Sequence, residues 1–209
     1  MINYILPILL FITTSSNSFA QKIIEREFDI ANLSAIKINS DNIFAIRVTS
    51  EKTNKIKIKT RIEGENFENV VLSAIVNDET LIISPEYTPF FEVKNDKLAA
   101  HKVIAIEIDL FVPENFEIEI KSILASVETL GSFKLISASL GRGNCTFNNF
   151  KGNAIVKTNE GAITIFANKE TSGTAISKKG TVINELSNSG VYSIKAESRG
   201  GDISLLQIH

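Results

Sequence analysis

Apolar and polar residues alternate along several short segments in the first half of the chain, with little sign of helical periodicity. Such alternation places apolar side chains on one face of a β-strand. Residues 77–80 separate two apolar runs, which predicts a hairpin with a four-residue connection. We therefore expect an antiparallel sheet or sandwich within residues 21–112. The alternating segments are Ile36–Ile38, Ile43–Val48, Lys55–Ile62, Leu81–Ile83 and Ile104–Leu110.

The last third of the chain is punctuated by glycine. Of the eleven Gly residues only Gly64 precedes position 130, whereas all four Pro lie before it. Two interleaved series repeat at intervals near twenty residues, so that turns recur about every ten. The first series is Gly143, Gly161, Gly180 and Gly201, each followed by a short apolar strand, and the second is Gly131, Gly152, Gly173 and Gly190.

A unit of this size cannot bury both of its edges alone, but stacked units pair every strand and close one apolar column. Residues 113–209 are therefore predicted to form a short β-solenoid of about four or five coils, right-handed or irregular. Glycine would serve corners that need a positive φ or a close backbone approach. Asn148, Asn149 and Asn153 are candidates for a ladder that caps corner backbone groups. The inward positions would include Ile163, Ile165, Val182, Ile203 and Leu205.

The first twenty residues are typical of an export signal. An uncharged apolar run from Tyr4 to Ile12 is followed by Ser18-Phe19-Ala20, the small-x-small pattern of a signal-peptidase site. The run is too short for a membrane-spanning helix, so no transmembrane segment is expected after processing. Cleavage would expose Gln21 in the periplasm, on the outer-membrane surface or outside the cell. The alternative is a buried N-terminal strand, because residues 1–3 carry no Lys or Arg.

Charge and cysteine content narrow the range of possible functions and partners. The net charge of −2 argues against a nucleic-acid partner, which would need a basic surface. The single Cys145 excludes an internal disulfide, so stability must come from the core, and we interpret this thiol as a small buried hydrophobe.

The sequence offers no recognisable catalytic or cofactor motif. Two His residues, His101 and His209, lack the spacing of a zinc site, and no nucleophile elbow, phosphate loop or dinucleotide fingerprint is present. We predict a non-enzymatic protein without a cofactor. The enzymatic alternative is a carbohydrate-active β-helix that uses paired carboxylates. Its candidate residues, each beside a glycine turn, are Glu160, Glu185, Glu197 and Asp202.

Two surfaces are candidates for interaction. Tyr87, Phe90 and Phe91 place three aromatic rings in a segment, residues 85–102, that lies between two strands. They would dock a partner or a sugar, or cap the open end of the apolar column. The basic row Lys55, Lys57, Lys59 and Arg61 would contact phosphates, or form the wet face of a strand opposite Glu107 and Asp109.

The stretch from Ile104 to Val127 resembles a known family. An alternating strand ends in Val112-Pro113 and is followed by a second alternating strand that begins the glycine-punctuated region. This pattern, over residues 30–209, resembles the putative adhesin (autotransporter-adhesin head-like) β-solenoid family of uncharacterised secreted bacterial proteins. The resemblance implies export to a Gram-negative envelope and surface binding, with no catalytic residues to transfer.

Three functions remain open at this point. The first is a secreted or envelope binding and adhesion module, with a surface glycan or an envelope protein as its partner. The second is a structural or sensory envelope protein that self-assembles as a homo-oligomer. The third is the carbohydrate-active enzyme.

Overall fold

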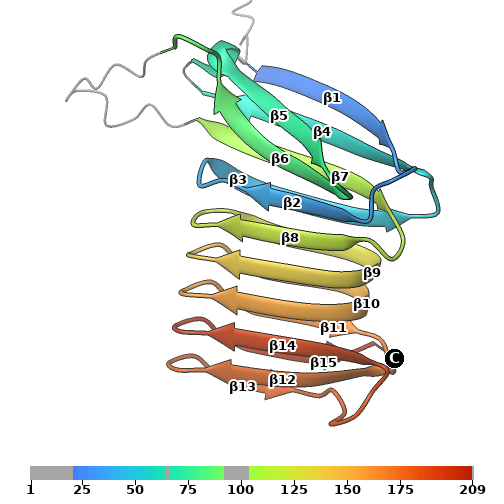
Figure 1. The fold of residues 1–209 in the computed structure, drawn as a ribbon. Helices are drawn as coiled ribbons and strands as arrows, with labels where there is room; N and C mark the ends of the chain where they lie inside the picture. The colour runs from blue at the N-terminus through green and yellow to red at the C-terminus, as the bar shows by residue number, and fades with distance from the viewer. Residues whose placement is uncertain (1–20, 65, 92–103, 209) are drawn as a thin grey trace, which may run out of the picture.

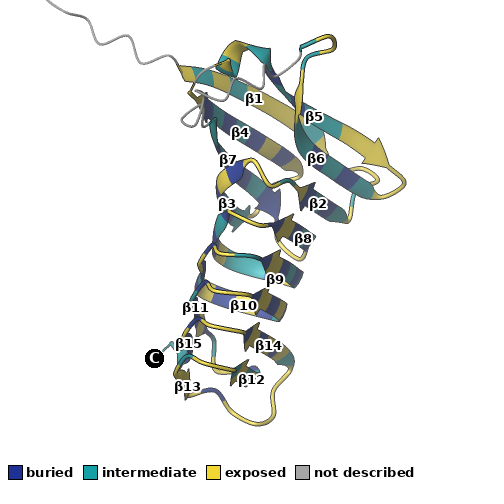
Figure 2. Cartoon of the chain, turned by 90° about the vertical axis from the view of Figure 1, so that its left-hand side faces the viewer, coloured by how far each residue is buried: buried dark blue, intermediate teal, exposed yellow. Residues whose placement is uncertain are grey.

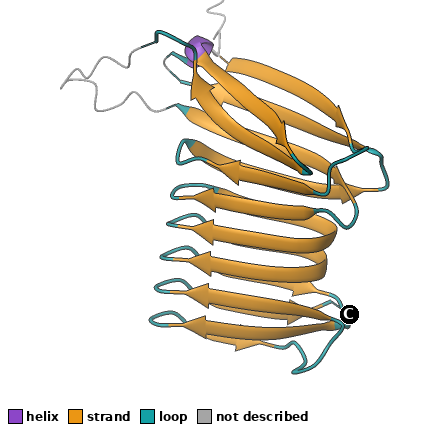
Figure 3. Ribbon diagram, in the orientation of Figure 1, coloured by secondary structure: helices purple, strands orange, loops and turns teal. Residues whose placement is uncertain are grey.

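The structure is a computed structural model that describes residues 21–64, 66–91 and 104–208, and it is all-β (Figures 1 and 3). The predicted leader, residues 1–20, and most of the 85–102 segment lie outside the described residues. No helix in the described ranges is long and apolar enough to cross a membrane. The elements are β1 (Gln21–Asp29), β2 (Ala35–Asn39), β3 (Ile43–Glu51), β4 (Lys55–Glu63), η1 (Phe67–Asn69), β5 (Val70–Asn77), β6 (Thr80–Tyr87), β7 (Ala105–Pro113), β8 (Glu117–Ser122), β9 (Ser126–Leu140), β10 (Cys145–Thr158), β11 (Ile163–Ala167), β12 (Thr171–Ser177), β13 (Val182–Asn184), β14 (Tyr192–Ser198) and β15 (Ile203–Gln207).

The strands form two stacks that face each other across one core (Figure 2). Stack 1 has the order β1-β4-β7-β3-β9-β10-β11-β15-β13. Stack 2 has the order β5-β6-β2-β8-β9-β10-β14-β12. The long strands β9 and β10 belong to both stacks, because each bends at a glycine with positive φ, Gly131 (φ +109) and Gly152 (φ +141).

The stacked turns are in parallel register. Cys145 pairs with Val127 on one side and with Ile163 on the other, each 18 residues away in the sequence. In Figure 1 the stack 2 strands run to the left in front, and the chain returns behind them as it descends, which makes the winding right-handed.

The N-terminal region is mixed rather than antiparallel. Antiparallel pairs join β1 to β4, β4 to β7 and β5 to β6, the last through a tight turn at Asp78 (φ +52) with Asn77 paired to Thr80. However, β3 lies parallel between β7 and β9, and β2 lies parallel between β6 and β8. The purely antiparallel expectation was wrong because alternation reports which face of a strand is buried, not which strand lies beside it.

The inward positions form a continuous apolar core. Ile163, Ile165, Ile203 and Leu205 are fully buried, as expected. Phe150 packs against Phe133 and Phe147, with ring centroids 6.1 and 5.1 Å apart. Val182 was also expected inside, but it is 43% exposed, because β13 ends stack 1 and pairs only with β15.

The last turns of the chain are not stacked in chain order. β15 lies between β11 and β13, and β14 lies between β10 and β12. The final β14–β15 turn is therefore inserted above the β12–β13 turn that precedes it in the sequence. Gly161 and Gly180 do not occupy successive corners as expected, because Gly201 lies between them.

These glycines form a column in which backbone packs on backbone, which we call the glycine column. A Cβ on Gly161 would overlap the carbonyl oxygen of Gly143, and one on Gly201 would overlap that of Gly161. Gly180 meets Gly201 in the same way, and Gly143 meets Ala125. None of these four glycines has a positive φ, so the requirement is close approach rather than an unusual backbone conformation.

Hydroxyl side chains close three of the four loops that carry this column. Ser177 and Ser198 accept hydrogen bonds from the backbone N–H three residues on, at Gly180 (2.9 Å) and Gly201 (2.8 Å). Thr158 instead donates to the Gly161 carbonyl (2.6 Å). Of the expected asparagine ladder, Asn153 bonds Lys134 O and Ser193 N in the neighbouring turns. Sequence analysis missed Asn144, which accepts from Ala162 N at 2.9 Å.

Truncation of an inward side chain should cost more stability on a strand inside the stack than on the strand at its end. Ile163→Ala leaves a hole between paired strands that cannot collapse, and should lower the free energy of unfolding by about 2–5 kcal/mol. Val182→Ala, on the exposed terminal strand, should cost at most about 1 kcal/mol. Chemical denaturation measures both, and equal costs would contradict the assignment of β13 to the end of the stack.

Two adjacent glycines in one loop, Gly200 and Gly201, allow a matched test of the glycine column. Gly201→Ala forces a methyl group onto the Gly161 carbonyl and should destabilise by about 1–3 kcal/mol. Gly200→Ala should change stability by no more than about 0.5 kcal/mol, because its Cβ would lie 3.4 Å from the nearest atom, Asn159 O. Thermal and urea unfolding compare the two variants. A Gly201→Ala protein as stable as Gly200→Ala would refute the column.

Candidate functional site

The aromatic segment lies at the N-terminal end of the stacks. Tyr87, at the end of β6, is 40% exposed and stacks on half-buried Phe91 with ring centroids 5.4 Å apart. Phe90 has φ +70 and is fully exposed. Phe90 therefore covers no part of the core, and the capping interpretation does not hold for this residue.

Tyr87 also borders a shallow apolar depression. The depression measures ≈ 220 Å³. Phe44 and Leu124, from β3 and the loop after β8, contribute side chains that are 62% and 50% exposed. Three separate chain segments thus bring large apolar side chains to one surface. The lining residues are Asp41, Asn42, Ile43, Phe44, Tyr87, Ile104, Ala105 and Leu124.

The opposite end of the core is covered by the segment after β13. Leu186 is 8% exposed and reaches the space beside Gly173. The side-chain amide of Asn184 donates to Gly173 O at 2.8 Å, and Gly173 N donates to Ser187 O at 3.2 Å. These bonds occupy backbone groups on the free edge of β12, so this segment does the capping that sequence analysis had considered for the aromatic rings.

The basic row of β4 is paired with acidic side chains. Lys59 lies 3.1 Å from Glu25, and Lys55 lies 3.2 Å from Glu27, whose pKa is lowered chiefly by that hydrogen bond. Arg61 contacts Glu107 and Asp109 of β7, as expected from the sequence. The row therefore forms the solvent-exposed face of β4, where its side chains make a ladder of ion pairs with the neighbouring strands.

Arg47 of β3 completes this ladder. Its guanidinium lies 3.0 Å from Asp109 and 3.1 Å from Glu107, and these hydrogen bonds raise the pKa of Arg47. The network links β3, β4 and β7 across the outer face of stack 1.

The isolated carboxylates named from the sequence have separate partners. Glu160 pairs with Arg142 (3.6 Å) and Glu197 pairs with Lys157 (3.1 Å). Asp202 accepts from the Thr181 backbone N–H (2.7 Å) and hydroxyl (2.9 Å), which hold its pKa below the usual range. Glu185 is exposed in the segment after β13. Within the described residues no group of three or more His, Cys, Asp or Glu side chains is placed to hold a metal ion.

Cys145 is fully buried in stack 1, as its interpretation as a small hydrophobe requires. Burial raises the pKa of the thiol far above its ordinary value. The thiolate needed for nucleophilic chemistry is therefore disfavoured.

A second depression, which sequence analysis missed, lies where β10, β14 and β12 meet their loops. We call it the loop-edge groove. It measures ≈ 410 Å³ and is open to solvent. The loops that line it belong to the glycine column and are joined by backbone hydrogen bonds. Arg199 N donates to Thr158 O (3.2 Å), and Lys178 N donates to Ser198 O (3.1 Å). Its lining residues are Lys157, Thr158, Asn159, Ile176, Lys178, Glu197, Ser198 and Arg199.

Comparisons with known proteins show similarity of fold. No family model matches the chain, and no curated protein matches it. A putative cell adhesion protein from Clostridium sporogenes superposes with a TM-score of 0.66 at 16% identity, covering 90% of this chain and 100% of that one. A putative adhesin from Bacteroides fragilis matches at 15% identity over 90% of this chain and 97% of its own, with a TM-score of 0.35. One from Parabacteroides merdae matches at 11% over 87% and 80%, with a TM-score of 0.36. The chain therefore shares its fold with the clostridial protein.

Proposed function

We propose that this protein is an exported, non-catalytic binding module of the cell envelope, in which a short β-solenoid displays surfaces for adhesion. The observation that carries the proposal is the similarity to the clostridial protein, which spans 90% of this chain and all of that one. At 16% identity it concerns the fold, and the adhesive role comes to this chain as our inference.

The solenoid interpretation is supported by the parallel register. Inward residues recur at an interval of 18 residues from Val127 to Cys145 to Ile163, and all three are fully buried. Each turn of chain thus contributes one layer to a common core, as solenoid coils do. Such a stack is rigid and presents wide outer faces to a partner.

Export is part of the proposal. Its support is the uncharged apolar run from Tyr4 to Ile12 followed by Ser18-Phe19-Ala20, the pattern of a signal-peptidase site. The mass of the protein purified from its native host should correspond to a chain that starts at Gln21. A mature chain that retains Met1 would remove this part of the proposal.

The aromatic surface around Tyr87 is the candidate contact for a partner. Large apolar side chains exposed together on a soluble protein mark interaction sites more often than solitary ones do. Phe90, Phe44 and Leu124 are exposed by 103%, 62% and 50%. Because Phe90 buries nothing, it is available for contact at no cost to the core.

Binding to a panel of immobilised glycans and purified envelope polymers tests this function. The folded mature protein should bind a member of the panel saturably and leave it chemically intact. Phe90→Ser should weaken that binding while the melting temperature stays unchanged. Val191→Ser serves as the control, because Val191 is also exposed (76%) and lies just before β14, near the other end of stack 2.

Each competing function predicts a different result. Release of shorter products from a bound polymer would indicate the carbohydrate-active enzyme. A mass in light scattering that rises with protein concentration, without binding to the panel, would indicate the self-assembling envelope protein. Failure to bind any member, with no change in mass, would contradict the adhesion function.

A further inference from the structure

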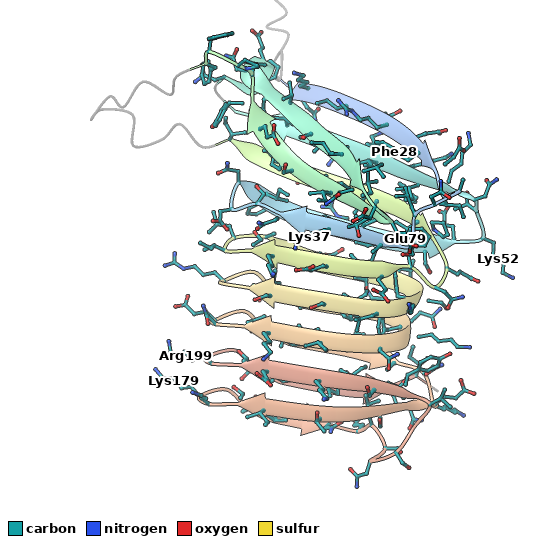
Figure 4. All side chains as sticks on the ribbon, viewed as in Figure 1. Phe28, Lys37, Lys52, Glu79, Lys179 and Arg199 are labelled. Carbon is teal, nitrogen blue, oxygen red and sulfur yellow. The ribbon has the colours of Figure 1, made fainter. Side chains whose placement is uncertain are left out.

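The loop-edge groove carries an excess of positive charge on a protein whose net charge is −2. Three cations line it, Lys157, Lys178 and Arg199, against one carboxylate, Glu197. Figure 4 shows Arg199 and the neighbouring Lys179 projecting from the loop edge, at the left of the view. Charge of one sign gathered in a depression attracts ligands of the opposite sign.

Two of the three cations have no acidic partner among the described residues. Lys157 pairs with Glu197 at 3.1 Å. The acidic residues of the adjoining loops are also engaged, Glu160 by Arg142 and Asp202 by Thr181. No described carboxylate lies within 4.0 Å of the charged nitrogens of Lys178 or Arg199. These two side chains therefore remain available to an anion from solution.

The floor of the groove is fixed and already satisfied. The buried hydroxyls of Thr158 and Ser198 are bonded to each other at 3.0 Å, and Thr158 also donates to Gly161 O. The backbone N–H groups of Lys178 and Arg199 bond to the neighbouring loops. Recognition must therefore come from side chains above this floor.

Those side chains combine charge with polar and apolar contact. A guanidinium binds carboxylate or phosphate oxygens in a bidentate geometry, and an ammonium adds a second charge. Asn159 offers an amide that both donates and accepts. Ile176 is 65% exposed and gives an apolar flank. The volume of ≈ 410 Å³ falls within the range of small-molecule sites.

We propose that the loop-edge groove binds an acidic sugar, a ring that carries a carboxylate or a phosphate group. Arg199 and Lys178 hold the acidic group, Asn159 bonds a ring hydroxyl, and Ile176 packs against the apolar face of the ring. An acyl chain would need an enclosed apolar cavity, whereas this groove is open and partly polar. The inference rests on the binding function proposed above and gives it a ligand class.

Titration followed by amide chemical shifts tests the groove. The probes are methyl β-glucuronide, glucose 6-phosphate, inorganic phosphate and the neutral methyl β-glucoside. The first two should shift amides around Asn159, Ser198 and Lys178, and glucuronide should bind about tenfold or more tightly than the neutral glucoside, since charged hydrogen bonds are lost with the acid. Binding should weaken as salt is raised.

Substitutions distinguish binding in the groove from a general effect of positive charge. Arg199→Ala and Lys178→Ala should each weaken binding of the acidic probes by about tenfold. Lys169→Ala removes the same charge from an exposed position in the turn between β11 and β12 and should leave binding unchanged. Circular dichroism and melting temperatures should show that all three variants remain folded.

The outcomes decide the proposal. Preference for glucuronide identifies a carboxylated sugar, and preference for glucose 6-phosphate over glucuronide identifies a phosphorylated one. Inorganic phosphate bound as well as either sugar would overturn recognition of a ring. Three results would refute the groove as the binding site for an acidic sugar. They are equal binding of acidic and neutral sugars, no shift with any probe, and a loss of binding in Lys169→Ala as large as in Arg199→Ala. Glycan-panel binding that survives in Arg199→Ala would then leave the proposed function standing without this site.

Discussion

The close approach of backbone to backbone in the glycine column is the constraint on which the rest of the structure depends. Parallel strands lie about 4.8 Å apart, so the loops that join them must stack at the same spacing. Gly143, Gly161, Gly201 and Gly180 allow this because each places its Cα against the carbonyl of the turn above. A side chain at these positions would separate the turns, and the inward residues of neighbouring strands would lose contact.

The same constraint explains how the last turns exchange places. Three of the four loops of the column combine a glycine with a hydroxyl residue three positions earlier, Thr158–Gly161, Ser177–Gly180 and Ser198–Gly201. The loops are therefore geometrically interchangeable, and the side chains of the strands decide the order. β14 brings Ile194 and Ala196 next to Ala154 and Val156 of β10. β12 has the small Gly173 and Ala175 at these positions and ends the stack, where Leu186 covers it.

Much of this could be predicted from local pattern, and the rest depends on long-range pairing. Alternation identified the strands and the wet basic face of β4, and the glycine spacing identified the repeated turns. The inward placement of Ile163 and Leu205 followed from the same pattern, whereas that of Val182 did not, because an inward pattern does not reveal that a strand is terminal. The recurrent hydroxyl-x-x-Gly spacing was a signal in the sequence that went unused. Of the candidate sites, the aromatic segment was visible as a cluster in sequence. The loop-edge groove was not, since Thr158, Lys178 and Ser198 come from three different turns of the chain and meet only through long-range strand pairing.

That exchanged order also links the fold to its proposed chemistry. Insertion of β14 between β10 and β12 places Arg199 between the loops of Asn159 and Lys178. In a stack that followed chain order, the β14–β15 turn would lie at the end, and Arg199 would not stand between them. The groove is thus a product of topology rather than of a local motif.

Engineered cysteine pairs test the exchanged order most directly. Thr164 of β11 is paired with Ser204 of β15, at the strand spacing of about 4.8 Å, which a disulfide can bridge. Ile183 of β13 lies one strand further away, at about 9.6 Å, beyond that reach. Under mild oxidation the Thr164→Cys/Ser204→Cys protein should form a disulfide, seen by mass after thiol alkylation, and the Thr164→Cys/Ile183→Cys protein should not. The reverse result would show that the turns stack in chain order and would contradict the account.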